Sequence, residues 1–371
     1  MIKGSATAKP QAFTAAVKWT AKFLAARPSV PIQGGLLLSI DGGQLSILGY
    51  NESTTARAIV EVEGAGTGQA VVSGRLLAEL AGTFPAKPVT IEGLGEDAES
   101  ISIAVGSWRG TLPAMKASQF PSPPPAPEVI GKVGGDALTS MIRHVAVARS
   151  DNPDASPKWH LMHLTFGEGL VVAMATDSYR AARETIAYDG TPGTALMHSG
   201  EMYDAAEAFA GPDDVHVGLS SNALGLASPT RAVILRQSGD AEYPLAQIRG
   251  LFTAAHPDHA QVAVADLHGP LKRAVIMRDK KQSISVRFGT DLIALAAESQ
   301  VERRTGEEEV AAAYRGAPWT LRFNPGYFAE ALASAPGETV DINLTTEKVS
   351  GIVLTVPGNE SWRHLLMPIQ K

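Results

Sequence analysis

The chain alternates between segments whose apolar positions recur every three or four residues and short apolar runs bounded by turn residues. Residues 12–27 are of the first kind, because Phe13, Val17 and Leu24 share one helical face and Pro28 ends the pattern. A second helix is predicted at 73–83, where Ser73 can cap the first turn. The short runs are typical of β-strands. Before residue 122 the predicted strands are 35–40, 45–48, 55–62, 89–91, 101–105 and 108–112.

The same order of elements begins again after Ser122-Pro-Pro-Pro-Ala-Pro127, a connector that cannot pair as a central strand. The later helices are predicted at 136–148, 200–210, 267–277 and 325–333. The later strands are predicted at 159–166, 170–174, 181–186, 215–219, 223–227, 232–236, 283–288, 291–297, 308–314, 319–323, 339–344, 351–356 and 364–368, with a loop at 238–257. An order that occurs three times at roughly 115–130 residues predicts three domains, 1–124, 128–257 and 258–371.

The composition limits what such a protein can be. The 371 residues are 44% hydrophobic, include no cysteine and carry a formal net charge of −6. Disulfides and thiolate sites are therefore excluded. No apolar run approaches the ~20 residues of a membrane span, and the N-terminus has no signal-peptide pattern, so we expect a cytoplasmic protein. A negative chain does not hold nucleic acid by electrostatic attraction alone.

The segment Ala175-Thr-Asp-Ser-Tyr-Arg-Ala181 places hydroxyl, carboxylate, aromatic and guanidinium groups side by side between two predicted strands. Asp and Ser side chains hydrogen-bond to their own backbone in such positions, so the segment is a turn by its chemistry. Taken alone, it is a well-satisfied β-turn. It gains meaning from four further motifs in the chain.

Five motifs, spread over the full length and in a consistent order, resemble the bacterial β sliding clamp family, the processivity factor of the replicative DNA polymerase. They are Ala26-Arg-Pro-Ser-Val-Pro-Ile32 with Leu36–Leu38, Phe120-Pro121, Ala175-Thr-Asp-Ser-Tyr-Arg180, Phe323-Asn-Pro-Gly-Tyr327 and Leu365-Leu-Met-Pro-Ile369. The resemblance implies an α+β protein of three repeated clamp-type domains. Two chains would form a head-to-tail homodimeric ring with helices lining the hole. DNA would then be retained by topology, which suits an acidic chain.

The resemblance also implies a hydrophobic cleft between the second and third domains that takes short peptides of partner proteins. The implied partners are the replicative DNA polymerase catalytic subunit, the clamp loader and other proteins with a clamp-binding motif. Aliphatic side chains, a methionine and prolines suit an adaptable apolar surface. The matching positions are Leu161, Thr176, Ser178, Tyr179, Arg180, Ala181, Pro244, Leu251, Asn324, Tyr327, Val349, Gly351, Leu365, Leu366, Met367 and Pro368.

The cleft departs from the family pattern at three of these positions. Ser178 and Tyr179 are bulkier than the usual Gly-His pair, and Ala181 is smaller than the usual leucine. A partner peptide of different sequence or affinity is therefore expected.

Duplex DNA is the implied ligand of the inner helices, through phosphate contacts that do not distinguish bases. The DNA-facing candidates are Lys18, Lys22, Arg27, Arg75, Arg143, Arg149, Lys158, Lys272 and Arg273. One predicted inner helix conflicts with this, because 200–210 carries Glu201, Asp204 and Glu207, and we expect these acids to face the rim. The dimer-edge candidates are Val105, Trp108 and Arg109 in the first domain and Val275, Ile276 and Met277 in the third, with Glu302 and Glu307–Glu309 facing basic groups across the edge.

No catalytic or metal-binding pattern is found, and the prediction is a non-enzymatic clamp without cofactor. His160 and His163 lie three apart on a predicted strand and so point to opposite faces. His256 and His259 form a weak ligand pattern, and Gly64-Ala-Gly-Thr-Gly68 lacks the Gly-Lys-Ser/Thr of a phosphate loop.

Three alternatives remain open at this point. The cleft departures suggest a specialised second-copy clamp, phage-encoded or inhibitor-resistant. A β-rich binding scaffold that does not encircle DNA would be favoured by a monomer in solution. An unrecognised hydrolase would be revealed by turnover that is lost when a histidine is replaced.

Overall fold

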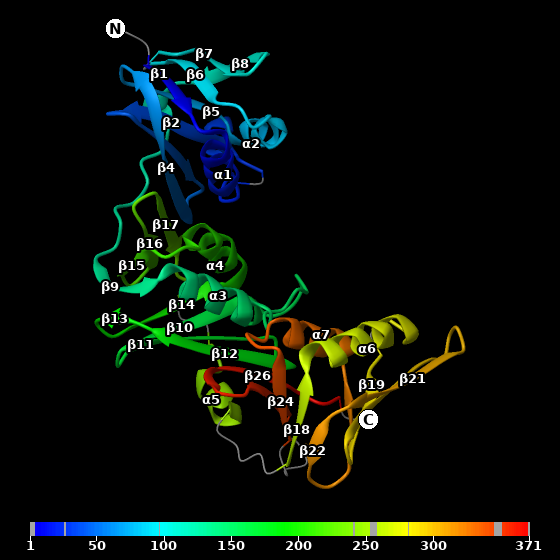
Figure 1. Cartoon of the computed structure of the whole chain (residues 1–371). Helices are drawn as coiled ribbons and strands as arrows, with labels where there is room; N and C mark the ends of the chain where they lie inside the picture. The colour runs from blue at the N-terminus through cyan, green and yellow to red at the C-terminus, as the bar shows by residue number, and fades with distance from the viewer. Residues whose placement is uncertain are drawn as a thin grey trace. The chain divides into compact units, whose positions relative to one another are not determined.

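The computed structural model describes residues 4–25, 27–95, 97–239, 242–252, 258–280, 282–344 and 351–369. Over these residues one order of elements, a strand, a helix and three strands, occurs six times. The elements fall into two compact units, Met1–Asp136 with Asp204–Gln237 and Ala137–Tyr203 with Ser238–Lys371. The division falls within two helices, at 136/137 and at 203/204. Figure 1 traces the elements along the chain from blue to red.

The first unit begins with two copies of the repeated order. They are β1 (Gly4–Ala8), α1 (Pro10–Ala21), β2 (Gly35–Asp41), β3 (Gln44–Tyr50), β4 (Thr54–Ala65), and then β5 (Gly68–Ser73), α2 (Gly74–Thr83), β6 (Val89–Leu94), β7 (Ser100–Val105), β8 (Trp108–Met115). The unit also contains β9 (Val129–Gly134), β15 (Asp214–Leu219), β16 (Ala223–Ala227) and β17 (Arg231–Arg236).

The strands of the first unit form one antiparallel sheet in the order β1-β6-β7-β8-β5-β2-β3-β4-β17-β16-β15-β9. Because β1 also pairs with β4, the strands from β1 to β4 close into a ring. Helices α1 and α2 pack against each other, and α1 also contacts β3 and β4. Gly74, at the start of α2, lets the segment after α1 come close, since a Cβ there would lie within 2.2 Å of Leu24 Cδ1.

The second unit contains β10 (Leu161–Gly167), β11 (Leu170–Thr176), β12 (Arg180–Ala187), β14 (Gly193–His198), α5 (Leu245–Phe252), β18 (Asp258–Ala263), α6 (Val264–Met277), β19 (Ile284–Gly289), β20 (Leu292–Ser299), β21 (Arg304–Ala311), β22 (Ala313–Arg315), β23 (Trp319–Phe323), α7 (Pro325–Ala333), β24 (Thr339–Leu344), β25 (Ile352–Val356) and β26 (Asn359–Leu366). β13 (Asp189–Gly190) is a further short strand. Helices α3 (Gly135–Ala146) and α4 (Ser199–Ala206) cross the unit boundary.

Two antiparallel sheets build the second unit, a nine-stranded one in the order β14-β10-β11-β12-β26-β25-β24-β18-β22 and a four-stranded one in the order β21-β20-β19-β23. Helices α6 and α7 pack against each other, and α7 contacts β26. The core beneath them includes Leu366, Phe328 and Trp362. Leu365, the neighbour of Leu366, instead packs against α5. Since successive strand residues point to opposite faces, α5 covers the face of the nine-stranded sheet opposite to α7.

All six helices predicted from the sequence are confirmed, α7 with the predicted bounds and the other five with shifted ends. Helix α1 ends at Ala21 instead of residue 27, and α4 passes into a 3-10 turn at Glu207–Phe209. The predicted strand at 159–166 begins two residues late, because Pro157–His160 forms a 3-10 helix. None of the described helices combines the length and apolar character that a membrane span requires.

Three local predictions were wrong. The expected loop at 238–257 contains α5. The expected strand at 308–314 is two strands, β21 and β22, which belong to different sheets. The last strand is Asn359–Leu366, so Met367 and Pro368 follow it instead of lying inside it.

Besides the two-residue β13, five strands were not predicted, namely β1, β5, β9, β14 and β18. Each has five or six residues and runs directly into a helix. Such a strand is too short for its alternating pattern to be separated from the helical pattern that follows. β1, with the sequence Gly-Ser-Ala-Thr-Ala, also lacks the branched and aromatic residues that mark strands.

Candidate functional site

The turn between β11 and β12 is formed by its own polar side chains. Oδ1 of Asp177 accepts hydrogen bonds from the backbone N–H groups of Tyr179 and Arg180, both at 2.9 Å. The hydroxyl of Thr176 donates to the carbonyl of Arg180 at 2.7 Å. Ser178 has φ +79°, a left-handed conformation that few residues other than glycine adopt. The motif therefore encodes one specific turn.

Arg180 lies beneath this turn and is only 2% exposed. Its Nε donates to Oδ2 of Asp177 at 3.0 Å, and its Nη1 donates to Oε2 of Glu330 on α7 at 2.5 Å. The guanidinium carbon lies 4.1 Å from the ring centre of Tyr327, also on α7. We call these four residues the Arg180 brace. The brace ties β12 to α7 and so fixes the turn against the helix.

The brace and its surroundings perturb three ionisable groups. Burial raises the pKa of Asp177, although the charge of Arg180 and the backbone hydrogen bonds oppose it. Burial also raises the pKa of Tyr327, and the charge of Asp177 adds to the effect. Burial lowers the pKa of His364 to about 3, assisted by the charge of Arg180. His364 is therefore neutral near pH 7, and neither ring nitrogen has a hydrogen-bond partner among the described residues.

An apolar cluster lies beside the turn, on the sheet face that α5 covers. We call it the outer apolar cluster. Its buried members are Met174, Ala181, Ile248, Phe252, Val353 and Leu365, and its half-buried members are Val172, Tyr243, Leu245, Leu251 and Met367. The backbone N–H of Met367 donates to the carbonyl of Tyr179 at 2.8 Å. This bond holds the segment after β26 against the turn.

The structure brings part of the predicted cleft together in this cluster. Ala181, Leu251, Leu365 and Met367 are members of it. At its edge stand Thr176, Ser178 and the 61% exposed Tyr179. The carbonyl of Pro244 accepts the N–H of Ile248 at 3.1 Å in the first turn of α5. Pro368, half-buried, follows Met367.

The other predicted cleft residues support the turn from within or lie elsewhere. Arg180 and Tyr327 belong to the brace, and Leu366 points into the core on the other sheet face. Asn324 caps α7 by accepting the N–H of Gly326 at 3.0 Å. Leu161 is buried at the start of β10, and Val349 lies outside the described residues.

Gly351 has a steric reason to be glycine. A Cβ at this position would come within 2.2 Å of the carbonyl oxygen of Leu366. Any larger residue would therefore push the start of β25 away from the end of β26.

Sequence reasoning missed more than half of the outer apolar cluster. The missed members are Val172, Met174, Tyr243, Leu245, Ile248, Phe252 and Val353. A signal was present in two places. Val172, Met174 and Thr176 alternate along β11, and Leu245, Ile248 and Phe252 have helical spacing inside the segment predicted to be a loop.

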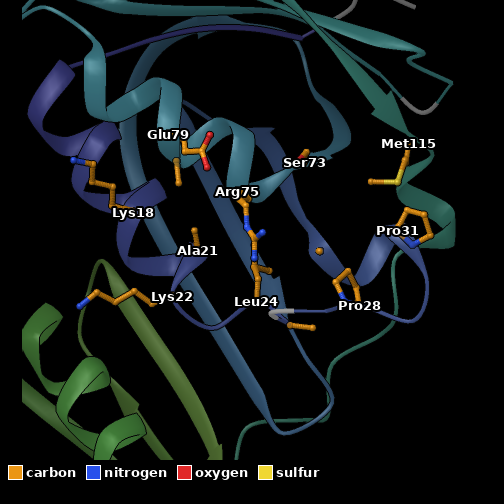
Figure 2. A pocket seen from close by; sticks show the side chains of 13 residues that line it. Lys18, Ala21, Lys22, Leu24, Pro28, Pro31, Ser73, Arg75, Glu79 and Met115 are labelled. Atoms are coloured by element: carbon orange, nitrogen blue, oxygen red, sulfur yellow. The ribbon is translucent and has the colours of Figure 1, made fainter.

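A second candidate site lies on the first unit, where a cavity of about 770 Å³ opens between α1, α2 and the segment after α1 (Figure 2). Lys18, Lys22 and Arg75 line it together with Glu79. Figure 2 shows Arg75 extending from α2 into the cavity. Three predicted DNA-facing cations therefore surround one hollow.

Lys22 is already neutralised within the chain. Its ammonium group lies 2.6 Å from Oε2 of Glu207 and 3.1 Å from Oδ1 of Asp204. Burial lowers the pKa of Lys22, but the hydrogen bonds and charges of the two acids outweigh it and leave the pKa above its ordinary value. Two of the three acids that conflicted with a basic inner helix therefore bind Lys22, and burial raises the pKa of the third, Glu201.

The remaining predicted DNA-facing residues differ in their surroundings. Arg149 donates to the carbonyl of Ala146 at 3.1 Å, and Lys158 lies 4.8 Å from the ring centre of Trp159. Arg273 forms an ion pair with Glu308 of β21. Lys18, Arg27, Arg75, Arg143 and Lys272 are exposed, as are Lys22 and Arg273.

The predicted dimer-edge residues also divide into exposed and buried ones. Arg109 is exposed at the start of β8, and Trp108 is partly exposed with its ring 5.3 Å from that of Phe84. Ile276 is 66% exposed on α6. Val105, in contrast, is buried in the first unit. Val275 is also exposed, whereas Met277 packs against the core of the second unit.

Three of the four predicted edge acids have partners in the same chain. Glu302 pairs with Arg304 at 3.1 Å, Glu309 pairs with Arg287 at 3.4 Å, and Glu308 pairs with Arg273. Glu307 is exposed on β21.

No group of three histidine, aspartate or glutamate side chains in the described part of the chain could hold a metal ion. His160 stacks on His198 with ring centres 6.1 Å apart, and His163 stacks on Tyr243 at 5.9 Å. His259 lies on β18, and His256 is outside the described residues.

The comparisons with known proteins agree on one family. Residues 6–124 match the model of the DNA polymerase III beta subunit N-terminal domain, and residues 249–370 match that of its C-terminal domain. The beta sliding clamp of Streptomyces coelicolor is 28% identical over 370 residues, 96% of each chain. The beta sliding clamp of Micrococcus luteus is 29% identical over 324 residues, 85% of this chain and 99% of the other.

Among solved structures, the DnaN sliding clamp of Pseudomonas aeruginosa bound to griselimycin matches with a TM-score of 0.88, 18% identity and 100% coverage of both chains. At this identity the likeness establishes the fold. The clamp fold predicted from the sequence is thereby confirmed.

Proposed function

The chain belongs to the DNA polymerase III beta subunit family, and on this premise we propose that it works as a DNA sliding clamp. It encircles duplex DNA and increases the processivity of the replicative polymerase. The observation that carries this function is a clamp fold over the whole chain, with family matches at both ends.

The ring consists of two chains, each with three domains at 1–124, 128–257 and 258–371. Supporting this, the strand–helix–three-strand order occurs six times in the described residues, two copies for each such domain. The chains meet head to tail, β8 of one near β21 of the other. β21 is an edge strand of its sheet, and unpaired edges favour pairing with another chain. Exposed Ile276 and the partly exposed Trp108 supply apolar contact area.

DNA is held by enclosure more than by charge. Cations that are exposed on or beside the helices include Lys18, Arg27, Arg75, Arg143 and Lys272. A chain with net charge −6 offers few phosphate contacts, so its affinity for a linear duplex should be weak, with a shallow logarithmic salt slope. Such a protein performs no catalytic step, and we place it in the cytoplasm with bacterial DNA.

Partner proteins bind through a short peptide at the outer apolar cluster. We expect the polymerase catalytic subunit, the clamp loader and other carriers of a clamp-binding motif to use it. Half-buried Leu251 and Met367 are available for contact, and a methionine adapts to different ligand shapes.

Retention on DNA tests the ring. The protein is loaded onto nicked circular plasmid with the clamp loader of the same source and ATP, and the mixture is passed through a sizing column before and after linearisation. The protein should elute as a dimer when free, travel with circular DNA and be lost from linear DNA. A monomer, or equal retention on both DNA forms, would contradict the proposal.

Peptide binding tests the partner surface. A fluorescein-labelled Gln-Leu-Ser-Leu-Phe peptide should bind saturably, and Met367→Ala should weaken binding about tenfold by removing apolar contact. Met115→Ala, a half-buried methionine of the first unit, serves as the matched control and should leave the affinity unchanged. An equal loss in both variants would argue against a site at the outer apolar cluster.

A further inference from the structure

Three arginines gather on the sheet face that carries the outer apolar cluster. Arg183 on β12 is paired directly with Arg363 on β26. Side chains at paired positions share a face and have Cβ atoms about 5 Å apart. Arg249 extends from α5 over the same face, where its Nη2 donates to the hydroxyl of Thr165 at 3.3 Å. We call these three residues the arginine cluster.

The charges of the arginine cluster are not neutralised by the described part of the chain. None of the three forms an ion pair with a carboxylate there. Arg363 donates Nη1 to the carbonyl of Phe252 at 2.9 Å, while its buried Nε has no acceptor. Arg183 is half-buried, and its guanidinium makes no hydrogen bond with any described residue. Burial, together with the charges of Arg363 and Arg249, lowers the pKa of Arg183.

The nearest acids in the sheet are engaged elsewhere. Glu184 follows Arg183 and therefore points to the other face, where its Oε2 lies 2.8 Å from Nδ1 of His144. Asp341 shares the face but lies two strands beyond Arg363, about 10 Å away by strand spacing. It accepts a hydrogen bond from Gln261 at 2.9 Å. Directly opposed like charges destabilise a sheet, so this arrangement is unfavourable in the free protein.

We propose that the arginine cluster binds a carboxylate side chain of a partner peptide whose apolar residues lie on the outer apolar cluster. This inference rests on the proposed function and adds a charge requirement to the partner. Guanidinium groups bind carboxylates in planar, bidentate geometry. A carboxylate would pair with Arg183 and remove the repulsion between Arg183 and Arg363.

Continuity with the apolar cluster selects a peptide as the occupant. Met174, a cluster member, is paired directly with Arg183 on the neighbouring strand. Ala181 lies two residues before Arg183, and Leu365 lies two residues after Arg363. Both apolar residues therefore share the sheet face of the arginines. Two residues of extended chain span about 6.6 Å. An extended ligand would therefore carry its acid two residues from an apolar anchor.

The position of the cluster also argues against DNA. The arginines lie on the sheet face opposite to α7, which packs on the face of Leu366. In a ring whose helices line the hole, this face is turned away from the DNA. A protein ligand is therefore favoured over a nucleic acid.

The test is a Glu/Gln scan of the two flanks of the Gln-Leu-Ser-Leu-Phe peptide, followed by fluorescence anisotropy. At one flanking position, two residues from an apolar anchor, the glutamate peptide should bind about tenfold tighter than the glutamine peptide. A tenfold difference in affinity corresponds to one hydrogen bond to a charged group. Arg183→Gln should abolish that preference and leave the affinity of the glutamine peptide unchanged. Arg315→Gln removes the same charge from exposed β22, four strands from β26 in the same sheet, and should preserve the preference.

The outcomes separate this inference from the proposed function. Binding of the peptide without any preference for glutamate would overturn the inference and leave the clamp intact. No peptide binding by a dimer that is retained on circular DNA would overturn the inference together with the partner surface. Weaker duplex binding by Arg183→Gln, with an unchanged peptide preference, would assign the arginines to nucleic acid and refute a peptide carboxylate.

Discussion

Strand β12 carries two arginines three residues apart that face opposite sides of the sheet. Arg180 is enclosed by Asp177, Glu330 and Tyr327. Its Nε and Nη1 donate to the two carboxylates, and its Nη2 donates to the carbonyl of Arg149. Arg183 has two arginines as neighbours and no carboxylate partner in the described chain. The first arrangement stabilises the fold, whereas the second destabilises the free protein. Charges that a chain leaves opposed and unpaired are better explained by a ligand than by folding.

Removal of the Arg180 side chain should have the largest effect on the stability of the protein. Arg180→Ala leaves the buried carboxylate of Asp177 without its cation, and breaking such a buried pair costs about 3–5 kcal/mol. Urea unfolding should show a lower midpoint for the transition of the second unit. Glu330→Gln is the milder control, because the Glu330 side chain is about half exposed. A loss below ~1 kcal/mol for Arg180→Ala would show that the brace is not structural.

The buried histidine beside the brace predicts a pH dependence. The pKa of His364 is about 3 in the folded chain and 6.5 when exposed. The folded state therefore binds fewer protons, and its stability is complete above pH 6.5 and is lost as pH falls toward 3. The loss should reach about 1.4 kcal/mol per pH unit within that window.

His364→Leu separates this effect from the titration of carboxylates. The variant removes two buried nitrogens that have no partner among the described residues, so it should gain about 1 kcal/mol at pH 7. Its unfolding free energy should also fall less steeply between pH 6.5 and 4 than that of the parent. Parallel pH profiles for the two proteins would contradict the assigned pKa.

Replacing Arg183 should stabilise the protein, whereas replacing Arg180 should destabilise it. Arg183→Gln relieves the repulsion by Arg363 and Arg249 and breaks no hydrogen bond within the described residues. We expect a gain of about 0.2–1 kcal/mol, measured as a higher thermal midpoint at low salt. The gain should shrink in high salt, because added ions screen the repulsion. Destabilisation by Arg183→Gln would mean that Arg183 supports the fold.

The two arginines also show what the sequence could and could not predict. Thr176, Asp177 and Arg180 are adjacent in the chain, so the turn that they form was predictable from local chemistry. The pairing of Arg183 with Arg363 joins residues far apart in the sequence, and only the sheet register reveals it. Register depends on which strands become neighbours, and no local pattern determines that choice.

Local signals also failed where two patterns competed. Leu245, Ile248 and Phe252 have helical spacing, but neighbouring turn residues favoured a loop. The helix forms because the face with these residues is buried against β11, β12 and β26, a tertiary contribution that helix propensity does not contain. The six helices were predictable because each has an apolar face long enough to show its period.

The smallest change in stability is expected at the surface ion pairs of Lys22 with Asp204 and Glu207. Both ion pairs are partly exposed, and an exposed ion pair contributes about 0–1 kcal/mol to stability. Asp204→Asn with Glu207→Gln should therefore lower stability by less than ~1 kcal/mol.

The same variant frees Lys22 for phosphate, so its duplex affinity should rise and depend more steeply on salt, by about one unit in the logarithmic slope. Fluorescence anisotropy of a labelled linear duplex over a salt series measures that slope. The matched double variant Glu302→Gln with Glu309→Gln removes two acids that pair with Arg304 and Arg287 instead, and it should leave the slope unchanged. An equal change in both variants would indicate a general effect of net charge and would remove Lys22 from the DNA-facing surface.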